Sequence, residues 1–348
     1  MQPPLRFMKT ILLSLALIGI SCAELSHDDH EDVNVDYAAA YVVNGYGNTI
    51  SVIRQSDHVV TATMSLHGAM YPHHIAYDSL RKILAVAITG TDLSGGHDHG
   101  GGSVEGLKIM ILDAVTGRML KELPCSGMPH NAMFVRAGAE LWFGEADSVR
   151  SRVRVVSTAE WTPMRSIDVG GGLSEVSISD DGTRVFATNT KDGTVSVIDP
   201  GRYEVLATIP VGVTPVGAWP AANGCMYVDN EGSRSVSEIV VKTASPGRTI
   251  DCGFMPAFVL YTPSKELWIT DATNGRVVWY TDDGTEWRKA GEIVTGLQAH
   301  ALALDSDGTT VYCTNQGAHT VSVIDAARHT VVATIAVGRQ PNGIVMRK

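Results

Sequence analysis

Histidines occur in this 348-residue chain at spacings that could build a metal site. His73 and His74 are adjacent, and His97-Asp98-His99 lies in a glycine-rich stretch. Zinc is most often bound by neutral imidazole, and a carboxylate commonly completes such a site. Imidazole also suits copper and nickel, so the residue types favour zinc without excluding those two metals. The candidate ligands are His73, His74, His97, Asp98, His99, His130, Glu175 and His300.

The elements that must position these residues come from an internal repeat. The stretch from Val311 to Gly343 matches Val185 to Gly217, and a third copy begins at Tyr41. Each copy contains short runs of Val, Ile and Thr separated by turn residues, which is typical of strands. A period of roughly 40–45 residues with four strands in each is the signature of a β-propeller. The sequence therefore predicts an all-β propeller.

Seven innermost strands are expected, one after each turn that resembles V-G-x-x-P. They begin near Pro72, Pro129, Leu173, Pro215, Pro256, Gln298 and Pro341. The chain ends on a lone inner strand, Gly343–Met346, and begins with a strand of second-strand type, Ala40–Val43. We expect these two strands to pair, because closing the ring in this way leaves no free edge. The result is a propeller of seven blades.

Aligning the starts of the seven inner strands brings the histidines to one face. The first column reads His73, His130, Ser174, Val216, Ala257, Ala299 and Asn342. The second column reads His74, Asn131, Glu175, Gly217, Phe258, His300 and Gly343. The first blade also carries an insertion, Thr89–Ser103, between its second and third strands, on the same face. His97, Asp98 and His99 should therefore lie near the inner-strand histidines.

The N-terminus carries a different signal. Residues 1–23 have two basic residues, an apolar run and a small-residue site, which indicates a secretory signal peptide. Cleavage is expected before Glu24, or at Cys22 if the chain is a lipoprotein anchored to a membrane through that residue. Residues 24–36 form an acidic tail, expected to be mobile, with His27 and His30 as further candidate ligands, and residues 37–348 form the propeller. The protein is expected to be periplasmic or otherwise exported.

The repeat resembles the YVTN family of seven-bladed propellers through T-N-x-x-x-x-T-V-S-V-I-D at Thr188–Asp199 and Thr314–Asp325. The histidines add a similarity to periplasmic zinc chaperones of the AztD type. That resemblance rests on the rim histidines, the His97–His99 segment and the tail. It implies a metallochaperone, without enzymatic activity, that passes zinc to the binding protein of a metal ABC importer.

Other functions stay open at this stage. The formal net charge of -10 argues against nucleic acid as a partner, because phosphate binding needs clustered Lys and Arg. No C-x-x-C-H or G-x-S-x-G motif occurs. One alternative is an oxidoreductase-like propeller that holds a non-covalent haem or a metal centre. Others are a hydrolytic metal centre with Glu175 as base, and a pure interaction propeller that binds a protein or glycan. If imidazoles bind the metal, its affinity should fall as the pH drops through about 6.5.

Overall fold

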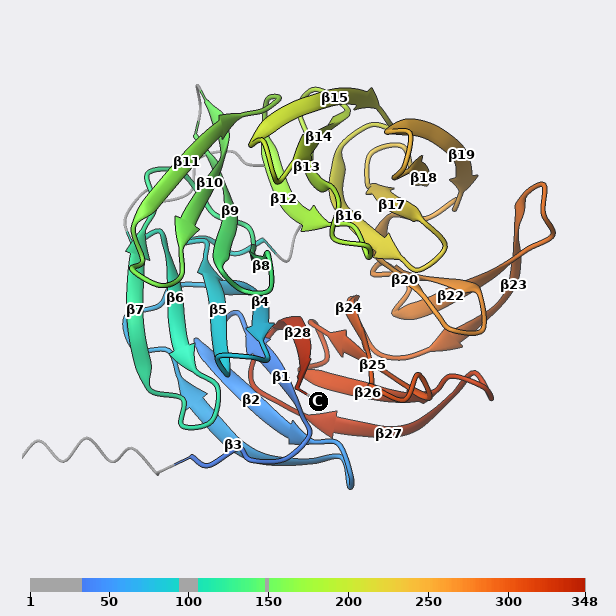
Figure 1. The fold of residues 1–348 in the computed structure, drawn as a ribbon. Coiled ribbons are helices and arrows are strands. Elements are labelled where there is room, and N and C mark those ends of the chain that lie inside the picture. The colour runs from blue at the N-terminus through green and yellow to red at the C-terminus, as the bar shows by residue number, and fades with distance from the viewer. Residues whose placement is uncertain (1–32, 94–105, 148–149, 348) are drawn as a thin grey trace, which may run out of the picture. The chain divides into compact units, whose positions relative to one another are not determined.

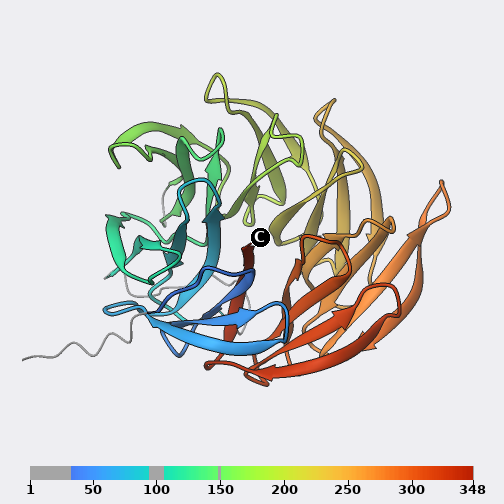
Figure 2. The same cartoon turned by 60° about the horizontal axis from the view of Figure 1, so that its bottom comes forward.

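The computed structural model describes residues 33–93, 106–147 and 150–347. Every regular element in these ranges is a β-strand, and the strands form seven antiparallel sheets of four strands each. Figure 1 and Figure 2 show the sheets arranged as blades around a common axis, with one strand of each blade facing the centre. The chain therefore folds as a seven-bladed β-propeller, as the repeat predicts.

The strands follow the same order in every blade, from the centre outwards. The innermost strands are β4 (Pro72–Asp78), β8 (Ala132–Val135), β12 (Leu173–Ile178), β16 (Pro215–Ala221), β20 (Pro256–Tyr261), β24 (Ala299–Leu304) and β28 (Pro341–Arg347). The second strands are β5 (Ile83–Ile88), β9 (Glu140–Ala146), β13 (Val185–Asn189), β17 (Cys225–Asn230), β21 (Glu266–Asp271), β25 (Thr310–Asn315) and β1 (Ala39–Asn44).

The third and outermost strands complete the blades. The third strands are β6 (Lys108–Asp113), β10 (Ser151–Ser157), β14 (Thr194–Asp199), β18 (Ser235–Val240), β22 (Arg276–Asp282), β26 (Thr320–Asp325) and β2 (Thr49–Arg54). The outermost strands are β7 (Met119–Pro124), β11 (Pro163–Asp168), β15 (Glu204–Pro210), β19 (Ser245–Asp251), β23 (Trp287–Val294), β27 (Thr330–Ala336) and β3 (Val59–Ser65). Second and third strands are buried on both faces, whereas outermost strands such as β3 and β27 alternate towards solvent.

The two ends of the described chain close the ring. Strand β28 pairs antiparallel with β1, with Val42 opposite Ile344. The side-chain amide of Gln55 donates to the carbonyl of Arg347 over 2.8 Å and ties the last strand to the β2–β3 turn. The predicted closure is confirmed, and its strands extend a residue or two beyond the expected bounds.

The packed part of the chain begins before the Tyr37 boundary that the repeats suggested. Val35 is fully buried and its backbone N–H donates to the carbonyl of Val115. The predicted signal peptide and the first nine residues of the predicted tail lie outside the described residues. Within the described ranges the structure contains no helix long and apolar enough to cross a membrane. Cys125, Cys225, Cys252 and Cys313 form no disulfide.

Candidate metal centre

The inner strands share an irregularity at the point where they enter the ring. In the blade of β12, Leu173 pairs with Asn189 and Val176 pairs with Ala187, so the inner strand carries one extra residue. The blade of β4 repeats this β-bulge between Pro72 and Ile75. A bulge redirects side chains that a regular strand would alternate between its two faces. The candidate ligands of β4 and β12 lie within these bulges.

The register of β24 corrects the sequence alignment of His300. Ala299 pairs with Asn315 just as Pro72 pairs with Ile88, so His300 corresponds to His73 and not to His74. Side-chain hydrogen bonds agree, because the N–H of Ala301 is bound by a second-strand threonine in the way that the N–H of Glu175 is. With this correction, the first column of the alignment holds seven buried residues: His73, His130, Ser174, Val216, Ala257, His300 and Asn342.

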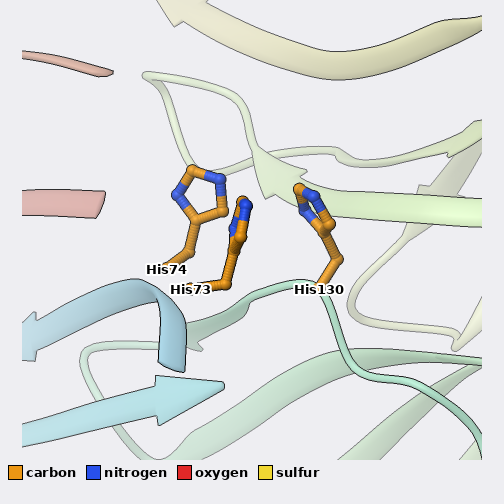
Figure 3. Close-up of side chains that lie close together, drawn as sticks. All are labelled: His73, His74 and His130. Atoms are coloured by element: carbon orange, nitrogen blue, oxygen red, sulfur yellow. The ribbon is translucent and has the colours of Figure 1, made fainter. Parts of the chain in front are cut away.

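Three imidazoles meet at the centre of the ring (Figure 3). The centroid of the His73 imidazole lies 4.5 Å from that of His74 and 4.4 Å from that of His130. The centroids of His74 and His130 are 5.1 Å apart. Each ring offers one nitrogen such that these atoms all lie within 4.8 Å of one another. His73 and His130 are buried, while the His74 side chain keeps 12% of its surface exposed. His74 is therefore the most exposed member of the cluster.

A carboxylate joins this cluster from the third blade. Oε1 of Glu175 lies 2.8 Å from Nε2 of His74 and 3.3 Å from Nδ1 of His130. Glu175 is almost completely buried, and its other oxygen, Oε2, has no hydrogen-bond partner among the described residues. A buried carboxylate oxygen in this position costs free energy unless a cation or donor satisfies it. The donor set of three imidazoles and one carboxylate matches what zinc selects.

The distances also set what metal binding would require. Zinc–nitrogen bonds of about 2.0–2.1 Å in a tetrahedron place the ligand atoms about 3.3 Å from one another. One nitrogen of each ring lies within 4.8 Å of the others. Metal binding would therefore require any two of these nitrogens to approach by at most about 1.5 Å.

Two local features hold the ligand-bearing strands together. A Cβ at Gly343 would lie 2.8 Å from the Cα of His74 and 2.9 Å from the carbonyl oxygen of His73, so only glycine lets β28 approach β4 this closely. Between β8 and β12, the Asn131 side chain donates to the carbonyl of Val176 and accepts from the N–H of the same residue. This clamp places the residue before Asn131, which is His130, beside Glu175.

The structure brings together some of the predicted ligands and leaves others aside. His73, His74, His130 and Glu175 form the cluster. The ring of His300 lies 5.8 Å from that of His73 and 6.0 Å from that of His74, adjacent to the cluster but not in its closest group. His27, His30, His97, Asp98 and His99 lie outside the described residues.

An aromatic pair beside the cluster was missed by the sequence analysis. The ring centroid of Trp219 lies 3.7 Å from that of Phe258 and 6.4 Å from that of His74. The indole N–H donates to Oδ1 of the buried Asp229 over 2.6 Å, which fixes the ring. Phe258 stood in the aligned column, but Trp219 lies two positions further on and its ring folds back over Gly217. The only sequence signal for this contact is the glycine at position 217, which leaves room for the indole.

No family model matches the sequence. A curated relative, virginiamycin B lyase of Nocardia farcinica, is 25% identical over 178 residues, which cover 51% of this chain and 61% of that protein. The match thus spans less than two thirds of the relative. The periplasmic gluconolactonase PpgL of Pseudomonas aeruginosa is similar in structure, with a TM-score of 0.70 and 16% identity over 89% of this chain and 99% of that one.

A second solved structure with a similar fold is dihydro-heme d1 dehydrogenase NirN. It has a TM-score of 0.61 and 12% identity, covering 88% of this chain and 74% of that chain. At these identities the two structures support the propeller fold alone, which different proteins use for different activities.

Proposed function

We propose that this protein is an exported zinc-binding propeller that holds one ion at His73, His74, His130 and Glu175. The observation that carries the proposal is the meeting of three imidazoles and a buried carboxylate from three neighbouring blades. A histidine whose only role is packing does not require other imidazoles and a carboxylate beside it. Copper and nickel would accept the same imidazoles, so metal competition is part of the test.

The proposed role of the ion is that of cargo. The zinc would enter and leave past His74, the most exposed of the three histidines, and would pass to the solute-binding protein of a metal importer. The similarity to AztD-type chaperones and the predicted signal peptide support this role. The histidine-rich tail and the His97–His99 segment would then assist loading or release.

The test is the metal content of the purified mature protein. Elemental analysis after zinc loading and desalting should give one tightly held ion, or two if the tail or the His97–His99 segment binds another. Replacing His73, His74 and His130 together by alanine should remove the tight ion, because at most one protein ligand remains. A matched control replaces His67 and His319, which lie outside the cluster, by glutamine and should leave the zinc content unchanged. Full stoichiometry in the triple variant would refute the site.

A second candidate is a metal centre that performs chemistry, or a propeller that holds haem. It is favoured by the partly exposed aromatic pair beside His74, which a cargo site does not need. Activity is also suggested by the name of virginiamycin B lyase, and haem by that of dihydro-heme d1 dehydrogenase. An absorption band in the visible range from the purified protein would favour haem, and zinc that resists transfer to an acceptor would favour a resident metal.

A further inference from the structure

The inner face of the ring divides into two chemically different sides. On one side, β4 contributes His73 and His74, the segment before β8 contributes His130, and β12 contributes Glu175. On the other side, β16 and β20 contribute Trp219 and Phe258, whose rings face each other at a centroid distance of 3.7 Å with an angle of 31° between their planes. His74 lies between the two sides, with its ring 6.4 Å from the indole. A partly exposed aromatic pair therefore adjoins the most exposed of the three clustered histidines.

The indole is held in this position by a buried carboxylate. Asp229, fully buried in β17, accepts the indole N–H over 2.6 Å and the backbone N–H of Gly217 over 3.1 Å. The ring covers the position where residue 217 would carry a side chain. Trp219 and Phe258 both retain partial exposure. The arrangement fixes a partly exposed aromatic pair beside the cluster.

Charge indicates which ligands this face would suit. A divalent ion bound by three neutral imidazoles and one carboxylate leaves the site with a net charge of about +1, so an anionic donor is favoured as a fifth ligand when the tetrahedral site expands to five-coordinate. An aromatic side chain adds stacking with a planar ring, which stabilises binding beyond the burial of area. The metal beside His74 favours an anionic group, and the neighbouring aromatic pair favours a planar ring. One molecule that carries both groups can make both contacts.

We infer that the surface formed by His74, Trp219 and Phe258 binds a small planar aromatic carboxylate, whose ring lies against the aromatic pair and whose carboxylate reaches the metal beside His74. The inference rests on the proposed metal site for its carboxylate contact, and on the aromatic pair for its ring contact. It assigns to Trp219 and Phe258 a ligand-binding role that a pure metal carrier would not require.

The test compares benzoate with acetate, which carries the same carboxylate without the ring. Calorimetry on the zinc-loaded protein should give at least tenfold tighter binding for benzoate. Trp219→Leu and Phe258→Leu should each reduce that ratio to less than threefold, while a control, Trp161→Leu in the β10–β11 turn, should keep it. Trp219→Phe, which retains an aromatic ring, should keep most of the preference. Thermal denaturation of each variant checks that the fold persists.

The outcomes separate this inference from the proposed function, because zinc content is measured on the same samples. If zinc binds and benzoate is no tighter than acetate, the aromatic site is refuted and the metal site stands. If no zinc binds, the proposed function fails, and the carboxylate contact with it. Benzoate binding to the metal-free protein, lost in Trp219→Leu, would then support the ring contact alone, and unchanged binding in that variant would overturn it.

Discussion

The regular blade of β24 to β27 and the histidine-bearing blade of β4 to β7 place different chemistry at the same register position. In the regular blade, Oγ1 of Thr314 accepts from the N–H of Ala301 and donates to the carbonyl of Asn342 in the next blade, both over 2.9 Å. Thr188 makes the equivalent contacts with Glu175 and Val216. One hydroxyl thus ties two inner strands together.

In the histidine-bearing blade the equivalent residue is Ala87, which has no hydroxyl to offer. Strand β4 is held from outside instead. The Asn342 side chain donates to the carbonyl of Pro72 over 3.3 Å, and the backbone of β28 approaches His73 and His74 at Gly343. The comparison teaches that the regular repeat stabilises the ring, whereas the departures from it build the site. Strand β28 is where the two regions meet.

The largest loss of stability is expected from removing strand β28. Deleting the last eight residues, from Pro341 onwards, takes away β28 and exposes the edge of β1. The loss should approach the whole stability of the domain, about 5–15 kcal/mol, so the cooperative transition disappears. Urea denaturation followed by tryptophan fluorescence measures this. A truncated protein with an unchanged midpoint would contradict the closure.

A middle effect is expected in the regular region alone. Thr314→Val removes two hydrogen bonds and leaves buried backbone groups unsatisfied, which should cost about 2–3 kcal/mol of the free energy of unfolding. Zinc stoichiometry should not change, because the threonine lies outside the ligand cluster. Thr330→Val, on the outermost strand, serves as control and should alter stability by less than 0.5 kcal/mol or so. A loss of zinc without a loss of stability would reverse the assignment of the two regions.

The smallest effect on stability, with a clear effect on metal, is expected at Gly343. Gly343→Ala places a Cβ against the backbone of His73 and His74, and β4 must move to relieve it. Overpacking of this kind costs about 1–3 kcal/mol. Displaced ligands should weaken zinc binding by about tenfold, in the range seen when groups that orient ligands are changed. Gly201→Ala, in an exposed turn, is the control, and competition with a chromogenic chelator measures affinity. Equal affinities would show that this contact does not position the ligands.

Most of the fold could be predicted because a sequence repeat specifies each blade. The T-V-S-V-I-D runs, the turns before each inner strand and the matching ends specify seven blades and their closure. These are local signals repeated many times, so an error in one copy is corrected by the others. The insertion after Thr89 was also visible, since it lengthens a single interval.

The site could be predicted only in part, because side-chain positions depend on register. His300 was aligned one residue off, since its turn lacks the proline that marks five of the other six inner strands. The turn glycine is a better guide to the alignment of this strand. Gly296 aligns with Gly212, and this places Ala299 in the same column as Pro215. The aromatic pair depends on Trp219 folding back over Gly217, and no spacing rule predicts such a contact. The bulge, which brings His74 and Glu175 together, carries no sequence mark of its own.

The central claim is that three imidazoles and a carboxylate bind one zinc ion at the centre of the ring. X-ray absorption at the zinc edge of the loaded protein tests it most directly. We expect nitrogen and oxygen neighbours at about 2.0–2.1 Å with outer-shell scattering from three imidazoles, and one imidazole fewer in His130→Ala. Sulfur neighbours at about 2.3 Å, or a first shell without imidazole scattering, would contradict the account.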